Sequence, residues 1–144
     1  MSQIHATCVE VDGLGVLLRG ESGAGKSDLA LRLIDGGARL VADDRTDLAA
    51  EDGRLVASCP APLAGRLEIR GLGIGPVPNV ARAPVALVVD LVAAEAVERL
   101  PEPEHCLIEG ISVRRLAVAP FEPSAPAKVR LAARWVQCGI MPAQ

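Results

Sequence analysis

The chain has 144 residues, 50% of them hydrophobic, a formal net charge of −3 and an isoelectric point of about 5.4. The acidic balance argues against nucleic acid as the main partner, and no apolar stretch reaches the ~18 residues that cross a bilayer. The length suits one domain over residues 1–144; four scattered cysteines and no secretion signal favour a cytoplasmic protein with buried thiols. With one Phe, one Trp and no Tyr, no aromatic shelf for a nucleobase is expected.

Short apolar runs between turn signals predict an α/β domain rich in strands. The expected strands are residues 4–11, 14–18, 38–42, 46–50, 54–59, a short extended piece at 67–70, and 85–92, the strongest of them. Helices are expected after residue 27, ending at Gly36-Gly37, from 93 to 100, and from 126 to 138 with Ser124 as N-cap. Residues 60–65 and 71–78 read as a loop and an irregular segment, because they are rich in Gly and Pro.

The segment Gly20-Glu21-Ser22-Gly23-Ala24-Gly25-Lys26-Ser27 matches the P-loop pattern G-x-x-x-x-G-K-[ST] in full. Its glycines let backbone N–H groups surround phosphate oxygens, and the following helix directs its positive end at the anion. Lys26 can reach the β- and γ-phosphates, so we expect it to face solvent or ligand, and the Ser27 hydroxyl can bind Mg²⁺. The Asn-Lys-x-Asp sequence typical of GTPases is absent.

Three acidic groups compete for the metal and for the chemistry. Asp90 ends an apolar strand, as the metal-holding Asp of many P-loop proteins does. Asp43-Asp44 ends the strand after the P-loop helix and can lie at the same sheet edge. Glu68 and Arg70 share one face of an extended piece, which offers an anion for a metal and a cation for phosphate. Each also has a plainer interpretation: a strand end, a turn, and a surface ion pair.

Together these residues resemble the HPr kinase/phosphorylase family, specifically its catalytic domain. The matching pieces are Gly20–Ser27 followed by Asp28, Arg39–Asp44, and Leu67–Ile74, which is close to that family's signature. His5 stands where the family carries an active-site histidine, although a half-buried strand histidine is the plainer interpretation. The resemblance runs from about residue 4 to the end of the chain.

The resemblance implies a kinase that transfers phosphate from ATP to a serine of HPr, the small phosphocarrier of the bacterial sugar phosphotransferase system. Many members also run the reverse phosphorolysis. The implied fold is a P-loop kinase fold of the phosphoenolpyruvate carboxykinase-like type, a mixed sheet with few helices, assembled as a hexamer. The implied roles are Gly20–Ser27 and Arg70 on the nucleotide, Ser27 and Glu68 on Mg²⁺, Asp44 as the base with Asp43 as its close second, and His5, Lys26 and Arg99 as further catalytic residues.

The chain departs from the family pattern in two respects. Typical members carry an additional N-terminal domain, so we expect a short form made of the catalytic domain. Efficient dephosphorylating members carry Pro-Val-Arg-Pro-Gly-Arg where this chain has Pro120–Lys128, with one lysine and no arginine. We therefore expect the kinase reaction more than its reverse. Two other functions stay open: a small-molecule kinase with Asp90 as metal ligand, and a nucleotide-binding regulatory module without turnover.

Overall fold

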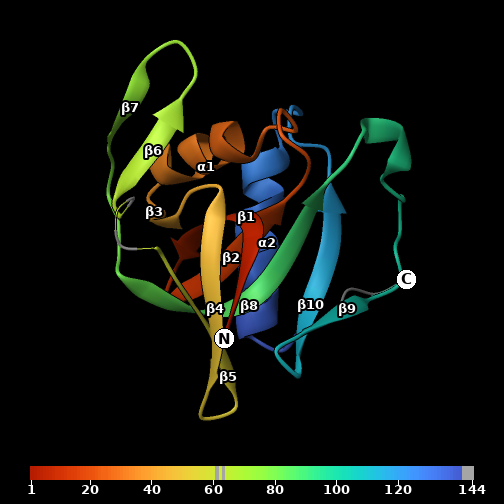
Figure 1. The fold of residues 1–144 in the computed structure, drawn as a ribbon. Coiled ribbons are helices and arrows are strands. Elements are labelled where there is room, and N and C mark those ends of the chain that lie inside the picture. The colour runs from red at the N-terminus through yellow and green to blue at the C-terminus, as the bar shows by residue number, and fades with distance from the viewer. Residues whose placement is uncertain (61, 63, 141–144) are drawn as a thin grey trace.

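The computed structural model describes residues 1–60, 62 and 64–140 (Figure 1). Its elements, in chain order, are β1 (Ser2–Val11), β2 (Leu14–Arg19), α1 (Lys26–Asp35), β3 (Arg39–Ala42), β4 (Arg45–Glu51), β5 (Arg54–Ser58), β6 (Arg66–Ile69), β7 (Gly73–Pro76), β8 (Arg82–Leu91), the 3-10 helix η2 (Ala94–Ala96), β9 (Glu104–Ile108), β10 (Ile111–Val118) and α2 (Ala125–Gln137). The architecture is mixed α/β with a large mixed sheet and two α-helices, which confirms this part of the expected fold.

The main sheet is folded back on itself by its two long strands, β1 and β8. In the described part of the chain it has eight strands, in the order β2-β1-β4-β5-β8-β10-β9, with β3 on β1 and a further pairing of β2 with β8. The pairs β2–β8 and β8–β10 are parallel, and the other pairs are antiparallel. Because β8 pairs with β5 through residues 82–84 and with β2 through residues 85–90, β4 and β5 form a second layer.

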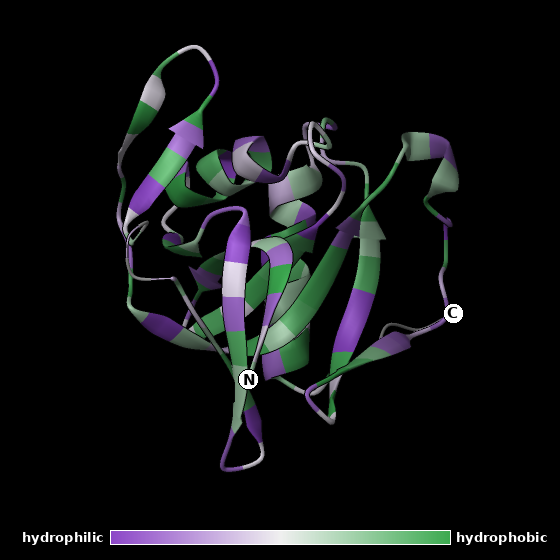
Figure 2. Cartoon of the chain, viewed as in Figure 1, coloured by the Kyte–Doolittle hydropathy of each residue, from purple (hydrophilic) through white to green (hydrophobic). Residues whose placement is uncertain are grey.

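Two aliphatic cores lie on the two faces of the central strands. Val16 and Leu18 of β2 face the helices, where they pack with Leu29 of α1 and Val129 of α2. Leu17, between them, faces the layer formed by β4 and β5. This alternation follows from the two-residue period of a strand. In Figure 2, β8, which contributes to both cores, is accordingly hydrophobic over much of its length.

The predicted helices are confirmed for α1 and α2, and the third predicted helix, between them in the sequence, does not form. In α2, Val129 and Ala133 are buried, but Ser124, the expected N-cap, makes no side-chain capping hydrogen bond. The expected helix from 93 to 100 is wrong, since only the short η2 forms before the chain turns toward β9. Within the described residues, neither α1 nor α2 is long and apolar enough to cross a membrane.

Strand predictions missed two hairpins. The segment 71–78, expected to be irregular, contains β7, which pairs with β6. The pair β9–β10 was not predicted, although Glu109-Gly110 between them, with both residues at positive φ, makes the turn. The strands expected at 46–50 and 54–59 are confirmed as β4 and β5, which pair as an antiparallel hairpin. In the loop expected at 60–65, residues 61 and 63 lie outside the described residues.

The expectation of buried thiols holds in part. Cys8 is fully buried, Cys59 and Cys106 are half-buried, and Cys138 at the end of α2 is exposed, so the expectation is wrong for Cys138. All four thiols are free.

Candidate active site

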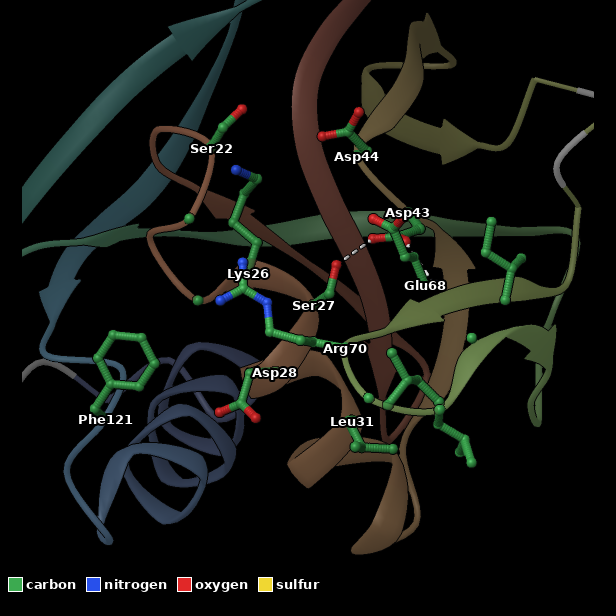
Figure 3. A pocket seen from close by; sticks show the side chains of 17 residues that line it. Ser22, Lys26, Ser27, Asp28, Leu31, Asp43, Asp44, Glu68, Arg70 and Phe121 are labelled. Atoms are coloured by element: carbon green, nitrogen blue, oxygen red, sulfur yellow. Dashed lines mark hydrogen bonds between the residues drawn. The ribbon is translucent and has the colours of Figure 1, made fainter.

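A cleft of about 850 Å³ opens at the carboxyl end of β2, between the start of α1 and the β6–β7 hairpin (Figure 3). The P-loop segment, which is Gly20–Ser27, forms one wall, and the hairpin forms another. Gly25 has φ of 100°, a left-handed conformation that a glycine adopts without strain, and α1 begins directly after it. The sequence therefore places the helix N-terminus and its unpaired N–H groups at the cleft, which is a favourable site for phosphate.

The Lys26 side chain contacts the backbone of the P-loop segment. Its Nζ donates hydrogen bonds to the carbonyl oxygens of Gly20 at 2.8 Å and Glu21 at 3.1 Å. The side chain is consequently 6% exposed, which differs from the expectation that it faces solvent or ligand. The ammonium group is nevertheless at the cleft wall, and its present partners are neutral carbonyl groups that a phosphate can replace.

Asp43 connects three elements around the P-loop segment. Its Oδ1 accepts hydrogen bonds from the Ser27 hydroxyl at 2.9 Å and from the Thr7 hydroxyl at 3.0 Å. Its Oδ2 accepts one from the backbone N–H of Glu68 at 3.1 Å. Both carboxylate oxygens are therefore engaged, which links β1, α1 and β6 to one another at Asp43. Sequence analysis missed Thr7, a buried hydroxyl in a strand otherwise read as core.

Asp44 has a different environment from its neighbour. Its carboxylate is 59% exposed and lies 2.5 Å from Nε2 of His5. Its φ of 64° is in the left-handed region, and its backbone N–H donates to the Thr7 hydroxyl at 3.2 Å. A second hollow, of about 550 Å³, shares Ser22 and Asp44 with the cleft and includes His5. The strained turn thus directs the Asp44 carboxylate to the border between two hollows.

Glu68 and Arg70 both line the cleft and are exposed. Within the described residues neither charged group has an ion-pair partner, so they do not form the surface ion pair considered above. In Figure 3, Arg70 reaches from the end of β6 toward the side of the cleft that carries Lys26. Two unpaired charges of opposite sign in one cleft are suited to a ligand that carries both a metal and phosphate groups.

Asp90 lies away from this cleft and is held by two arginines. Arg19 binds both its oxygens, at 2.8 and 3.0 Å, and Arg115 binds Oδ2 at 2.7 Å. Burial by itself would raise the pKa of the Asp90 carboxyl, but the hydrogen bonds and charges of Arg19 and Arg115 together lower it. The same carboxylate raises the pKa of Arg19. Asp90 therefore serves as the centre of an ion-pair network that joins β2, β8 and β10.

Arg99 is exposed after η2 and does not line the cleft. The structure therefore brings together His5, the P-loop segment, Asp43, Asp44, Glu68 and Arg70, and it leaves Arg99 apart from them. One lining residue, Phe121, was not singled out from the sequence. It follows β10 and precedes α2, and only the three-dimensional arrangement places it beside the P-loop segment.

The donor set at the cleft consists of oxygen atoms. Ser27, Asp43 and Glu68 supply a hydroxyl and two carboxylates, while the described residues contain no group of three or more His, Cys, Asp or Glu side chains that could hold a metal by themselves. Mg²⁺ usually takes one or two carboxylates together with water and substrate phosphates. The residues present therefore fit Mg²⁺ delivered with a nucleotide better than a metal enclosed by protein ligands alone.

A mixed α/β fold with a glycine-rich loop, a helix N-terminus and acidic side chains around one cleft is typical of proteins that bind phosphate groups. A family model described as the HPr Serine kinase C-terminal domain matches residues 1–123. A solved structure, the HPr(Ser) kinase/phosphatase from Coxiella burnetii, superposes with a TM-score of 0.86 and 32% identity over 96% of this chain and 98% of that one. The chain belongs to the HPr serine kinase C-terminal domain family.

Curated relatives agree over a shorter region. The HPr kinase/phosphorylase of Clostridium tetani is 50% identical over 78 residues, which is 54% of this chain and 26% of that protein. The one from Lactiplantibacillus plantarum is 51% identical over 77 residues, or 53% of this chain and 24% of that protein. The chain thus covers about a quarter of the length of these relatives.

Proposed function

We propose that this chain is an ATP-dependent protein kinase that phosphorylates a serine of the phosphocarrier HPr. The observation that carries the proposal is the gathering of Lys26, Ser27, Asp43, Asp44 and Glu68 around one cleft at a helix N-terminus. These residues come from three separate stretches of the chain, and they are the residues that the family resemblance implies. The solved relative with the same fold is named an HPr(Ser) kinase/phosphatase, which supports this substrate.

In this proposal the P-loop segment binds the ATP phosphates through its backbone N–H groups. Lys26 exchanges the carbonyl groups of Gly20 and Glu21 for phosphate oxygens, and Arg70 adds a second positive charge. Asp44 takes the proton of the serine hydroxyl, because its carboxylate is exposed at the border with the hollow that contains His5. Asp43 is less suited to that role, since hydrogen bonds occupy both its oxygens.

Ser27 and Glu68 are the proposed Mg²⁺ ligands, and Asp43 orients the Ser27 hydroxyl through their hydrogen bond of 2.9 Å. Mg²⁺ bound with ATP neutralises charge that develops on the transferred phosphoryl group. Glu68 fits because its carboxylate lines the cleft without an ion-pair partner in the described residues.

Two competing functions have less support. A small-molecule kinase with Asp90 as metal ligand is disfavoured, because Arg19 and Arg115 engage both oxygens of that carboxylate away from the cleft. A regulatory module without turnover is disfavoured by the exposed Asp44 carboxylate next to the P-loop segment.

The reverse phosphorolysis is the weaker half of the proposal. The only basic residue of the segment 120–128 is Lys128, whose Nζ lies 3.6 Å from a carboxylate oxygen of Glu122. A lysine with an acidic neighbour is a weaker phosphate ligand than the two arginines of the family pattern.

A P-loop kinase fold of the phosphoenolpyruvate carboxykinase-like type, assembly into a hexamer and a cytoplasmic location complete the proposal. The first two depend on the family resemblance, and four free thiols favour a reducing compartment. Light scattering on a sizing column measures the assembly.

Incubation with HPr and Mg-ATP, followed by intact-mass analysis, tests the function. We expect HPr to gain one phosphate, and an HPr whose target serine is replaced by alanine to gain none. Phosphorylation of a small molecule without modification of HPr would favour the competing kinase. Nucleotide binding without any transfer would favour the regulatory module.

A further inference from the structure

Phe121 is an aromatic side chain that lines the cleft together with the P-loop segment. The chain has one Phe, one Trp and no Tyr, and this Phe lines the cleft while remaining 69% exposed. An exposed aromatic ring at a cleft lined by charged groups is a candidate contact for an apolar part of a ligand.

The ring lies against the P-loop segment. A methyl group at Gly25 would come within 2.9 Å of Phe121 Cζ and 3.1 Å of Cε1, so the absence of a side chain at Gly25 lets the ring approach the loop backbone. The ring edge is therefore next to the backbone that is proposed to bind phosphate, while the residue as a whole stays 69% exposed.

The turn that carries Phe121 is fixed to α1. The Arg32 guanidinium donates hydrogen bonds to the carbonyl oxygens of Pro120 and Glu122, the two residues that flank the ring, and it also binds Asp28. Pro120 is buried, and the Ala125 N–H donates to the Glu122 carbonyl at 3.0 Å. The ring is thus presented by anchored backbone, which lowers the entropy that a ligand contact costs.

The position of the ring relative to the acidic residues indicates how a nucleotide would be oriented in the cleft. Figure 3 shows Phe121 on one side of the P-loop segment and Asp43, Asp44 and Glu68 on the other. The acid drawn nearer to the ring, Asp28, is paired with Arg32 at 2.9 Å. Metal ions in phosphoryl transfer bridge the β- and γ-phosphates. If the acidic side holds the γ-phosphate end, the nucleoside extends toward the side of Phe121.

We propose that the base of the nucleotide donor stacks on the ring of Phe121. Such a contact was not expected from the sequence, because the chain has so few aromatic residues. The proposal rests on the proposed function, because it needs a nucleoside triphosphate in this cleft. Aromatic stacking accepts any base, since each has a π-face, so the site favours nucleotides over inorganic polyphosphate without selecting strongly among bases.

The test compares Mg-ATP with Mg-tripolyphosphate, which carries the phosphates without a base. Binding of both is measured by calorimetry on the wild type and on Phe121→Ala, Phe121→Trp and a control, Leu107→Ala. Leu107 is 74% exposed on β9, outside the cleft, so this control also removes an exposed apolar side chain. Circular dichroism checks that each variant is folded.

We expect Phe121→Ala to weaken ATP binding about tenfold and to leave tripolyphosphate binding unchanged, a loss on the scale measured for base stacking. Phe121→Trp should restore ATP binding, and its additional fluorescence should be quenched by ATP and not by tripolyphosphate. Leu107→Ala should bind both like the wild type.

Equal weakening of ATP and tripolyphosphate in Phe121→Ala would overturn the proposal, because the ring would then support the loop and not the base. Unchanged ATP binding with a raised KM for HPr would also overturn it and assign the ring to the protein substrate. In both cases transfer to HPr by the wild type would leave the proposed function standing. If the wild type neither binds ATP nor phosphorylates HPr, the proposed function fails first and this inference with it.

Discussion

Nε2 of His5 and Oδ1 of Asp44 lie 2.5 Å apart, joining two residues that are 39 positions apart in the chain. Within the described residues the Asp44 carboxylate accepts no other hydrogen bond, so Oδ2 stays available. The pair therefore consists of an oriented carboxylate with one free oxygen, whereas both oxygens of Asp43 are engaged. This asymmetry adds a geometric difference between two adjacent acids that the family resemblance ranked only narrowly, with Asp44 first and Asp43 as its close second.

Asp44→Asn should lose most transfer to HPr while keeping nucleotide binding, because the amide preserves shape and removes the proton acceptor. Removal of a general base costs about 10²–10⁴-fold in rate. Asp43→Asn should have a milder effect on the rate of transfer. Single-turnover transfer to HPr measures both variants. A dead Asp43→Asn with an active Asp44→Asn would reverse the ranking, and retention of transfer within about tenfold in both would exclude a base from this pair.

Lys26→Ala should abolish detectable transfer, since loss of one charge that stabilises a transition state costs about 10²–10³-fold. Lys26→Met is the matched variant, because it retains an unbranched side chain and removes the ammonium group. The hydrogen bonds lost to Gly20 and Glu21 belong to the loop and not to a core. Thermal unfolding of both variants should therefore stay close to that of the wild type. Normal turnover in a stable variant would remove the P-loop segment from the mechanism.

Glu68→Gln should raise the Mg²⁺ concentration needed for half-maximal transfer by at least about tenfold, because even residues behind a metal ligand alter metal affinity on that scale. Asp90→Asn is the comparison, since its carboxylate is held by Arg19 and Arg115. Its Mg²⁺ dependence should equal that of the wild type. The ordinary P-loop arrangement would be correct if Asp90→Asn lost the dependence on Mg²⁺ and Glu68→Gln kept it.

The strands that are continuous apolar runs and the helices with clear periodicity could be predicted from the sequence, and the weakly patterned elements could not. Residues 14–18 and 85–92 are almost wholly apolar, and they form the parallel pair at the centre of the sheet. The hairpin of β6 and β7 was missed in part because Gly73 and Gly75 weaken any strand signal, yet backbone pairing with β6 forms a strand there. No residue of segment 93–100 is buried, so little packing is available to stabilise a helix there.

The candidate site, too, could be predicted from the sequence only in part. The P-loop segment is contiguous, so its pattern is visible in the sequence, and the acids were found through motif pieces. Thr7 and Phe121 carry no local pattern, because their relevance arises only where distant elements meet. Asp90 shows the opposite case: the sequence suggests a metal ligand, and Arg19 and Arg115, from two neighbouring strands, engage it instead.

Cys8 should resist thiol reagents at pH 8 in the folded protein. Burial raises the pKa of its thiol to about 12, against a smaller lowering by a backbone hydrogen bond from Val16, so almost no thiolate forms. Cys138 is exposed and should react rapidly. Mass spectrometry after brief labelling identifies the modified residue, and labelling in urea should modify both. Rapid labelling of Cys8 without denaturant would contradict the packing of β1 between its neighbours.

Asp90→Asn should destabilise the fold by about 1–3 kcal/mol at pH 7, the range for hydrogen bonds to charged groups, with part of it screened by solvent. Since Arg19 and Arg115 lower the pKa of this carboxyl in the folded state, its stabilising effect is present above its ordinary pKa of 3.8 and is lost as the pH falls below it. The difference between wild type and variant should therefore shrink toward pH 3. Urea unfolding at several pH values measures it, with Glu102→Gln, an exposed acid outside the network, as control. A difference that stays constant with pH would show that the loss reflects packing and not the charge on Asp90.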